Sequence, residues 1–382
     1  MVCEMLVRLG FECSVADLFA DRDTQLICEG RVTKLEALSD LGGVERLVRE
    51  NDFVVFTGGL EGSAAIADTL SRWSKPAFAS RKSLEDLADY RILNQAMTQA
   101  GVDRYPFSRD PLTHDSGTSV FKNLCHSGTA RMVAAKDQTQ FSKDECVFQQ
   151  YISGMSVSLI FVAKNGTATC LGESKQLVDP VNDLMWVGSI SGQFLNPGEK
   201  AAANRFANSL TSLVGMTGVF GIDFVRNEDG IWPVDVNPRI PASAEVIGDH
   251  VMRNHLQAFG IECPPVAESG ADSSELCQGK KVIFNRSPNP VRFNEAVLEE
   301  LPFRFSNPCS PTNIADVPQR DEVIGPGHPI CTVLASGNCE EAVHSVLAAL
   351  ETKVLLVLGL ENIDLAKPGR KVNCELDAKT SS

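Results

Sequence analysis

Three polar residues interrupt two apolar, β-branched segments near the middle of the chain. Asp223 lies within GIDFV, and Asp235 and Asn237 lie within IWPVDVN. Aspartate and asparagine are poor strand formers, so their presence in strand-like segments requires an explanation other than folding. Because Mg²⁺ and Mn²⁺ prefer carboxylate and amide oxygens, a divalent-metal site is the first chemistry to consider.

A hairpin would bring these side chains together. Glu228-Asp229-Gly230 suits a three-residue loop with glycine in the left-handed conformation, and this register pairs Asn227 with Ile231. Counting back along both strands places Asp223 opposite Asp235, with the asparagine on the same face. Like charges in this position destabilise a ladder unless a cation lies between them. Because Mg²⁺ takes few protein ligands, the arrangement implies a phosphorylated nucleotide; the alternative is a polar face that meets solvent.

The elements that must position this hairpin begin with an α/β section, residues 1–85. It alternates helical segments with short strands and ends with DFVVFTGG, an apolar strand that finishes at Gly58-Gly59. This pattern predicts a parallel sheet with a functional loop at the carboxyl end of a strand. The section opens inside a helix instead of a strand, which favours either a trimmed domain or a start upstream of Met1.

Residues 86–265 form the second predicted section. Apolar residues at helical spacing predict one helix across LEDLADYRILNQAMTQAGV, from Leu84 to Val102. KNG, from Lys164 to Gly166, predicts a hairpin turn. The strands predicted before the central hairpin lie around Val120, at 147–152 and at 157–163.

Residues 275–360 are predicted to form a small C-terminal α+β module, followed by a polar, flexible tail at 361–382. CEEAVHSVLAALET predicts a helix in this module. The apolar run from Val354 to Leu360 is too short to span a bilayer and is interpreted as a buried strand. The whole chain is therefore expected to combine α/β and α+β organisation.

Composition limits the function classes. The 382 residues carry a formal charge of -14 and are 43% hydrophobic, which suits two or three packed domains. This charge argues against nucleic acid as the main partner, although it allows a small phosphorylated ligand. The first residues lack the basic region and cleavage site of a signal peptide, and no membrane partner is expected. A cytoplasmic protein is the resulting prediction.

GIDFV together with DGIWPVDVNPRI resembles the metal-binding signature of the ATP-grasp superfamily. The resemblance implies that Asp223, Asp235 and Asn237 hold two Mg²⁺ ions that bridge the phosphates of ATP. It also implies that Arg239 directs its guanidinium at the transferred phosphoryl group or the substrate carboxylate. The expected architecture is an ATP-grasp fold with a Rossmann-like N-terminal domain and a small C-terminal module.

Other segments resemble the family in the expected order. SVFKNLCHSGTARMV resembles the strand and flexible loop that close over the phosphates, with Lys122 as the phosphate-binding lysine. CVFQQYISGMSVSLIFV resembles the adenine-binding hinge, with Gln149 near the adenine amine, and GESKQLVD places Lys175 on a strand that contacts the triphosphate in relatives. The resemblance assigns further nucleotide contacts to Ser127, Gly128 and Thr129 at the loop tip, to Gln150, Tyr151 and Ile152 in the hinge, and to Ser156 or Ser158 near the ribose or phosphates.

The chain departs from the family pattern at three points. The phosphate loop has fewer glycines than usual, and Asn123 replaces the proline that commonly follows the lysine. A lysine usually follows an aspartate at the start of the helix that ends in Ala-Gly, but here the segment reads Asp89-Tyr90-Arg91. Arg91 either replaces that lysine or faces solvent.

The resemblance implies an ATP-dependent ligase that joins a small-molecule carboxylate to an amine through an acyl phosphate. GESKQLVDPVNDLMWVGSI, DLFADRDT and ADVPQRDEVIGPGHPICTVLASG also resemble a subgroup typified by tyramine–glutamate ligase. This subgroup suggests glutamate and an aromatic amine, in one-carbon cofactor biosynthesis. A homodimer is a separate expectation for the assembly. Two alternatives are a carboxylase-like or carbamoyl-phosphate-forming enzyme that uses bicarbonate, and a non-catalytic nucleotide-binding regulatory protein.

Overall fold

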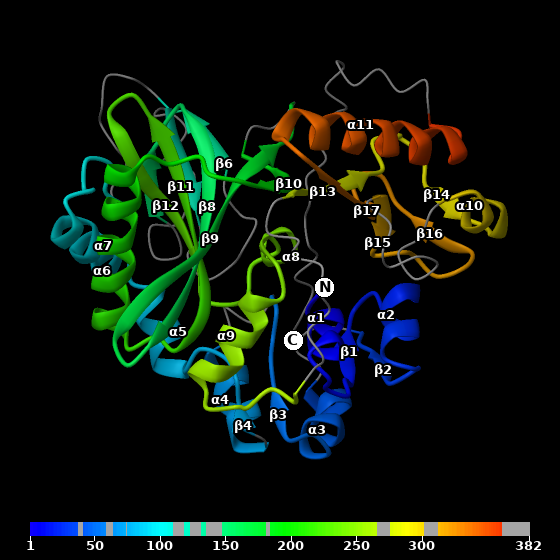
Figure 1. The fold of residues 1–382 in the computed structure, drawn as a ribbon, viewed down its shortest axis with the longest axis horizontal. Helices are drawn as coiled ribbons and strands as arrows, with labels where there is room; N and C mark the ends of the chain where they lie inside the picture. The colour runs from blue at the N-terminus through cyan, green and yellow to red at the C-terminus, as the bar shows by residue number, and fades with distance from the viewer. Residues whose placement is uncertain are drawn as a thin grey trace, which may run out of the picture.

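The computed structural model describes residues 1–36, 41–58, 64–73, 75–109, 118–122, 131–134, 147–180, 184–265, 276–301 and 312–360. Their central sheet contains β8 (Met155–Lys164), β9 (Thr167–Val178), β10 (Trp186–Ser191), β11 (Gly218–Asn227), β12 (Gly230–Asn237), β13 (Cys277–Phe284), β15 (Thr312–Ala315) and β17 (Pro329–Gly337). The strand order is β12-β11-β8-β9-β10-β13-β17-β15, and every neighbouring pair is antiparallel (Figure 1). One sheet therefore joins the second predicted section to the C-terminal module.

The strands of this sheet follow from local sequence signals. The predicted turn at Lys164 to Gly166 joins β8 to β9, with Asn165 and Gly166 both at positive φ, as the tightest hairpin turns require. The predicted strands at 147–152 and 157–163 are also present, with small shifts of their ends. Turn residues and alternation were sufficient to predict the β8–β9 hairpin because its loop contains only a few residues.

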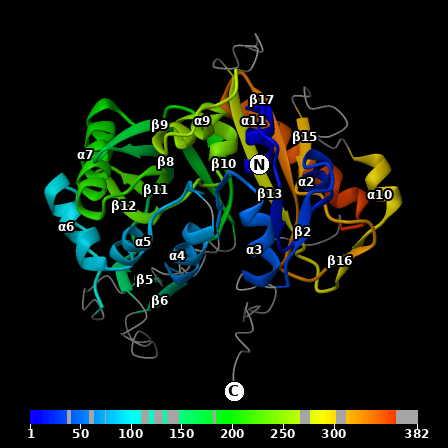
Figure 2. The ribbon, with the colours of Figure 1, turned by 90° about the horizontal axis from the view of Figure 1, so that it is seen from below.

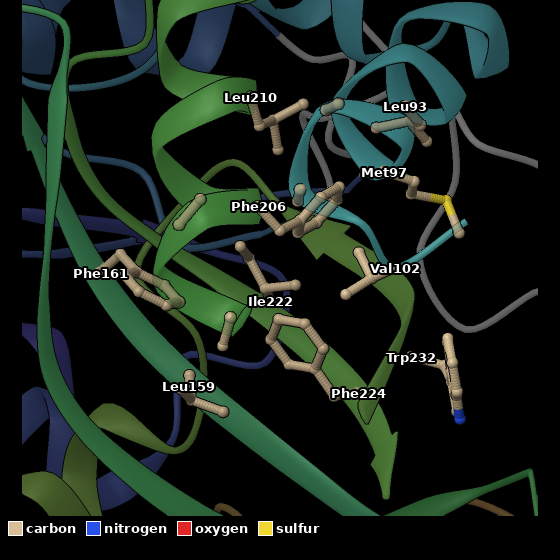
Figure 3. Packing of buried hydrophobic residues seen from close by; sticks show 14 of the residues in the cluster. Leu93, Met97, Val102, Leu159, Phe161, Phe206, Leu210, Ile222, Phe224 and Trp232 are labelled. Carbon is tan, nitrogen blue, oxygen red and sulfur yellow. The ribbon is translucent and has the colours of Figure 1, made fainter. Parts of the chain in front are cut away.

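Helices cover one face of the first half of the sheet. They are α5 (Arg81–Leu87), α6 (Tyr90–Ala100) and α7 (Pro197–Val214). Figure 3 shows side chains from three elements packed together: Leu93 and Met97 of α6, Phe206 and Leu210 of α7, and Ile222 and Phe224 of β11. The opposite face of the same strands carries Ser158 and Asp223 and, farther along, the buried apolar residues Ile160, Val162 and Val219.

The single helix predicted from Leu84 to Val102 is wrong, because the chain forms α5 and α6 separately. Asp89 adopts an extended conformation between them, and its carboxylate accepts a hydrogen bond from the backbone N–H of Arg91 at 3.0 Å. This is an N-cap, and it starts a new helix inside an apparently continuous apolar pattern.

The N-terminal section contains the parallel strand pairs expected of an α/β domain. Its elements are α1 (Val2–Arg8), β1 (Val15–Asp17), α2 (Arg22–Ile27), β2 (Val32–Lys34), α3 (Leu41–Arg49), β3 (Phe53–Val54), α4 (Ala64–Trp73) and β4 (Lys75–Pro76). β1 pairs with β2 and β3 pairs with β4, both in parallel. Among the described residues these pairs form two separate sheets, and in Figure 1 the blue N-terminal elements lie below the central sheet.

A small antiparallel sheet flanks the central one. It has the order β6-β5-β7 and consists of β5 (Thr118–Lys122), β6 (Arg131–Ala134) and β7 (Val147–Gln150). β7 leads directly into β8, which connects the two sheets. The last residue of β5 is the lysine that the sequence assigns to phosphate binding.

The C-terminal module packs α11 (Glu340–Val357) against β13 and β17, and adds β14 (Val291–Phe293), α10 (Glu295–Glu300) and β16 (Glu322–Ile324). The predicted strand from Val354 to Leu360 is wrong, because α11 continues to Val357. Val343, Leu347, Leu350 and Val354 lie on one helical face and are buried in the module's core. Figure 2 shows α6 and α7 at one end of the molecule and α10 at the other.

Two short helices lie on the face of the sheet opposite α7. They are α8 (Ala244–Ile247) and α9 (His250–Ala258), which follow β12 in the chain. α8 contacts β9, β10 and β13, and α9 contacts β8 and β11. Among the described residues, no helix has the length and apolar character needed to cross a membrane.

Candidate active site

The β11–β12 hairpin places the two predicted carboxylates opposite each other. Asp223 pairs with Asp235, as predicted. The turn itself is shorter than predicted, because Asn227 pairs with Gly230 instead of the following residue. A β-bulge that contains Val234 shifts the register back by one residue before the carboxylates. The bulge is thus the feature that brings the two side chains to the same position on the ladder.

Asp223 is surrounded by hydrogen-bond donors from three strands. The Asn237 amide donates to Asp223 Oδ2 at 3.4 Å, and the side chains of Ser158 on β8 and Gln176 on β9 also hydrogen-bond to this carboxyl. Burial, and then the charge of Asp235, raise the pKa of Asp223 to about 6. A bound cation would remove this electrostatic penalty on the charged form.

Lys122 approaches the same carboxylates from the small sheet. Its ammonium donates a hydrogen bond to the backbone oxygen of Val234, the bulge residue, and lies 5.6 Å from the centre of the Phe107 ring. Burial lowers the pKa of Lys122, whereas Asp235 and Asp223 act in the opposite direction. The predicted phosphate-binding lysine is therefore positioned beside the predicted metal ligands.

Arg239 lies next, where the chain leaves β12. Its guanidinium donates to Asn237 Oδ1 and to the backbone oxygen of Ile240, both at 3.4 Å. A methyl group on Gly58 would lie only 3.5 Å from Arg239 Nε, so the segment after β3 contacts this side chain. Gly58, at the end of the apolar segment that the sequence predicts in the N-terminal section, thus lies beside the guanidinium.

The donor set fits a hard divalent cation. Asp223, Asp235 and Asn237 offer carboxylate and amide oxygens, which Mg²⁺ and Mn²⁺ prefer over nitrogen or sulfur. In the part of the chain that the structure describes, no group of three or more His, Cys, Asp or Glu side chains is placed to hold a metal ion. A cation at the two carboxylates would complete its coordination with phosphate oxygens and water.

Lys175 is not brought to this site. Its neighbour Ser174 pairs with Ser158, on the face where Asp223 lies, so Lys175 points toward the opposite face of the sheet. There its ammonium forms an ion pair with Glu340 of α11 at 2.7 Å. The triphosphate contact predicted for Lys175 has no support from this placement, because the prediction identified the strand but not the register.

The segment that the resemblance assigns to the adenine hinge lies at the end of β7. The Gln149 amide donates to the backbone oxygens of Tyr105 at 2.8 Å and Pro233 at 3.1 Å. Both of its N–H groups are therefore used by the protein, and only its oxygen could meet a ligand. The other predicted contacts are Gln150, Tyr151 and Ser156, which are half-buried, and Ile152, which is buried in the core.

The remaining sequence assignments concern the tip of the phosphate loop and Arg91. Ser127, Gly128 and Thr129 lie outside the described residues. The Arg91 side chain is 76% exposed and forms an ion pair with Asp89 at 2.6 Å, which agrees with the solvent-facing alternative.

Sequence reasoning missed Gln176 as a partner of Asp223. The available signal was the alternation in ESKQ, which places Ser174 and Gln176 on one face of a strand and Lys175 on the other. Alternation alone does not say which face meets the carboxylates. Only the pairing of β9 with β8 decides this.

Comparison with known proteins identifies the fold. Residues 88–243 match the model of a family described as an ATP-grasp domain, and the structure has the ATP-grasp fold. An uncharacterised protein of Methanocaldococcus jannaschii is 23% identical over 207 residues, which cover 52% of this chain and 45% of the relative. The chain thus spans less than half the length of this curated relative.

Solved structures of three enzymes resemble the chain over most of its length. Biotin carboxylase from Campylobacter jejuni has a TM-score of 0.68 at 13% identity, covering 90% of this chain and 86% of its own. L-amino acid ligase from Bacillus licheniformis has a TM-score of 0.65 at 16% identity, covering 92% and 94%. N5-carboxyaminoimidazole synthase from Aspergillus clavatus has a TM-score of 0.64 at 13% identity, covering 93% and 95%. At these identities the likeness is one of fold.

Proposed function

We propose that this chain is an ATP-dependent, ADP-forming carboxylate–amine ligase that uses MgATP. The proposal rests on one observation, which is that these side chains lie close together. Asp223 pairs with Asp235 across the hairpin, and Asn237 and the Lys122 ammonium lie beside them. Arg239 adds a planar cation at the edge of this group. The fold agrees, since the biotin carboxylase with the same fold was solved with a β,γ-ATP ligand.

The side chains divide the work of phosphoryl transfer. Asp223, Asp235 and Asn237 would hold Mg²⁺, which would neutralise charge on the phosphate oxygens. Lys122 binds the phosphates, and Arg239 orients the substrate carboxylate or the transferred phosphoryl group. Catalysis in this scheme depends on positioning and on electrostatic stabilisation, and it requires no protein nucleophile.

The proposed reaction has two chemical steps. A carboxylate oxygen of the acid attacks the γ-phosphorus of ATP, the bond to the bridging oxygen breaks, and ADP leaves. The amine nitrogen then attacks the acyl carbon of the acyl phosphate, the acyl carbon–oxygen bond breaks, and phosphate leaves. The nitrogen loses a proton, which completes the amide.

The proposed substrates are glutamate and an aromatic amine, in one-carbon cofactor biosynthesis. The support is the resemblance of GESKQLVDPVNDLMWVGSI and DLFADRDT to the tyramine–glutamate ligase subgroup. The L-amino acid ligase with the same fold is consistent with an amino acid as one substrate. The cytoplasmic location and the homodimer stay predictions from the sequence.

Hydroxylamine tests the acyl-phosphate step. At high concentration it should replace the amine and give a hydroxamate of the acid, with ADP and phosphate in equal amounts. The assay would start with L-glutamate and extend to the other amino acids. Product should require Mg²⁺ and should be lost in Asp223→Ala and Asn237→Ala. Formation of AMP and pyrophosphate would instead indicate an adenylate, and the acyl phosphate would have to be abandoned.

A second candidate function is a carboxylase-like or carbamoyl-phosphate-forming reaction, since biotin carboxylase is among the enzymes that share this fold. In that case ADP release should depend on bicarbonate and not on an added amino acid. Measuring ADP release with and without bicarbonate separates the two reactions. Nucleotide binding without turnover under every condition would favour the regulatory alternative.

A further inference from the structure

A cavity of about 1290 Å³ is bordered by two strands of the N-terminal section, β1 and β3. All three residues of β1 line it, and so do residues 53–58, which comprise β3 and the segment that follows it. Among the described residues, β1 pairs with β2 alone and β3 with β4 alone, and neither β2 nor β4 lines the cavity. The cavity therefore adjoins one free edge of each parallel pair.

The backbone of β1 directs hydrogen-bonding groups toward this cavity. The N–H of Val15 donates to the backbone oxygen of Arg31 at 2.9 Å, and the N–H of Leu35 donates to the oxygen of Asp17 at 2.8 Å, so Val15 and Asp17 face β2. Successive residues of a strand turn their backbone groups to opposite edges. The N–H and C=O of Ala16 therefore face the cavity.

The backbone of β3 has the same arrangement on the other side. The N–H of Ala77 donates to the backbone oxygen of Val54 at 2.8 Å, so Val54 faces β4. The next residue, Val55, turns its N–H and C=O toward the cavity, which it lines. Buried backbone groups are nearly always paired, so the two edges need a partner with donors and acceptors on both sides.

Helices cover both faces of this gap. Leu6 of α1 packs in one apolar cluster with Val15 of β1 and Phe53 of β3, and the Phe11 ring lies 5.4 Å from that of Phe53. On the other face of β3, Val54 packs in a cluster with α3 and α4. A strand that is buried on both faces is typical of the interior of a parallel sheet, so the gap lies inside a sheet and not at its edge.

We propose that a β-strand of this protein fills the gap and joins the two pairs into one parallel sheet, between β1 and β3. A strand fits because it presents N–H and C=O groups to both neighbours. Met1, which precedes α1, also lines the cavity, and a helix packed over the sheet, as α1 is, usually connects neighbouring parallel strands. The strand is therefore assigned to the residues directly upstream of Met1. The inference holds whichever reaction the active site performs.

The surroundings define the chemistry of this strand. The cavity is lined by Leu6 of α1, Val48 of α3 and Leu70 of α4, so the strand should be apolar on both faces and about five or six residues long. Its centre should contain no proline, because both neighbours need its backbone groups. Since the strands run in the same direction, its carboxyl end would lie at the edge of the sheet where Gly58 contacts Arg239.

The first test uses the chain of 382 residues as it is. Residue-resolved hydrogen exchange should show that the amides of Ala16 and Val55 exchange at least about tenfold faster than those of Val15 and Val54, the matched neighbours that face β2 and β4. Equal protection of all four amides would show that the two edges already have partners, and would overturn the proposal. Protection that increases with protein concentration would show that a second copy fills the gap, and would overturn the assignment to the upstream segment.

The second test extends the protein by the ~15 residues encoded upstream of Met1, enough for one strand and a loop. The melting temperature should rise by at least about 5 °C, and the amides of Ala16 and Val55 should become as protected as those of Val15 and Val54. The control carries the same extension with two central residues replaced by proline, and it should show neither effect. A stop codon within the upstream stretch, unchanged exchange at Ala16 and Val55, or equal stabilisation by the proline control would overturn the proposal.

Discussion

The pair Asp223 and Asp235 is electrostatically unfavourable in the protein without a cation. Burial and the opposite carboxylate raise the pKa of Asp223 to about 6, although Ser158, Gln176 and Lys122 all favour its charged form. Such a pair lowers the stability of the hairpin that carries it, so its retention is explained by a function in ligand binding. The loss of hairpin stability and the capacity to bind a cation have the same cause, which is the presence of two negative charges at one position of the ladder.

Asp235→Asn is expected to separate these two effects. Turnover should fall by at least about 100-fold, because one charged metal ligand is lost. The melting temperature of the nucleotide-free protein should stay the same or rise slightly, because a like-charge repulsion is removed. The measurements are steady-state ADP release and thermal unfolding of the purified variant.

Asp229→Asn provides the control on the same hairpin. Asp229 lies in the turn, is 53% exposed and pairs with Arg104 at 2.6 Å. An exposed ion pair contributes little, so this variant should keep both turnover and stability. Full activity in Asp235→Asn, or equal losses in both variants, would refute the metal assignment.

Among the elements, α9 contributes a buried histidine that contacts both β11 and the N-terminal section. His255 Nδ1 accepts the backbone N–H of Val219 on β11 at 2.9 Å, and Nε2 lies 2.8 Å from the backbone oxygen of Ala77. A carbonyl only accepts, so Nε2 carries the proton and the ring is neutral. Burial lowers the pKa of His255 to about 4. His255 therefore connects α9, the central sheet and the N-terminal section without acting as a metal ligand.

This histidine predicts a specific acid sensitivity. The unfolded chain binds a proton near pH 6.5, whereas the folded chain binds it only near pH 4, so the unfolded state gains stability as the pH falls between these values. The free energy of unfolding should decrease by ~3 kcal/mol from pH 7 to pH 4 through this group alone. His255→Gln should remove this component from urea-unfolding curves. His250→Gln, at an exposed position of the same helix, should retain it; equal pH dependence in both variants would contradict the prediction.

At the scale of the whole molecule, the N-terminal section completes the site by contacting Arg239. Gly58 leaves room for the guanidinium, since a methyl group there would be in ordinary contact with Arg239 Nε at 3.5 Å. A larger side chain would overlap the guanidinium and move it. The two sections of the chain therefore meet at the residue that the proposal assigns to the substrate carboxylate or phosphoryl group.

Gly58→Leu and Gly58→Ala form a graded test of this contact. The alanine variant should keep turnover within a few-fold, whereas the leucine variant should lose about 100-fold, because displacing a positioning group by about 1 Å can cost this much. Neither variant should change the melting temperature strongly, since the contact lies at the edge of the N-terminal section. Steady-state kinetics of both proteins measures the difference. Equal turnover in the two variants would show that Gly58 does not determine the position of Arg239.

The sequence by itself determined the features that depend on neighbouring residues. Alternation with period two predicted that Asp223 and Asp235 share a face, and the Asn-Gly turn predicted the β8–β9 hairpin. These patterns report which side chains share a face within one element. They involve short loops, so few alternative pairings compete with them.

The tertiary structure alone decided features that depend on pairing between distant segments. The pairing of β9 with β8 placed Gln176 at the site and directed Lys175 toward Glu340, and the bulge at Val234 corrected the register of a turn that is shorter than predicted. The apolar segment that begins at Val354 also continues α11 instead of forming a strand, because α11 packs against β13 and β17. The physical reason is that an apolar or alternating pattern determines only which side chains share one face of a helix or strand. Strand register, bulges and the element that packs against that face depend on contacts between residues far apart in the sequence.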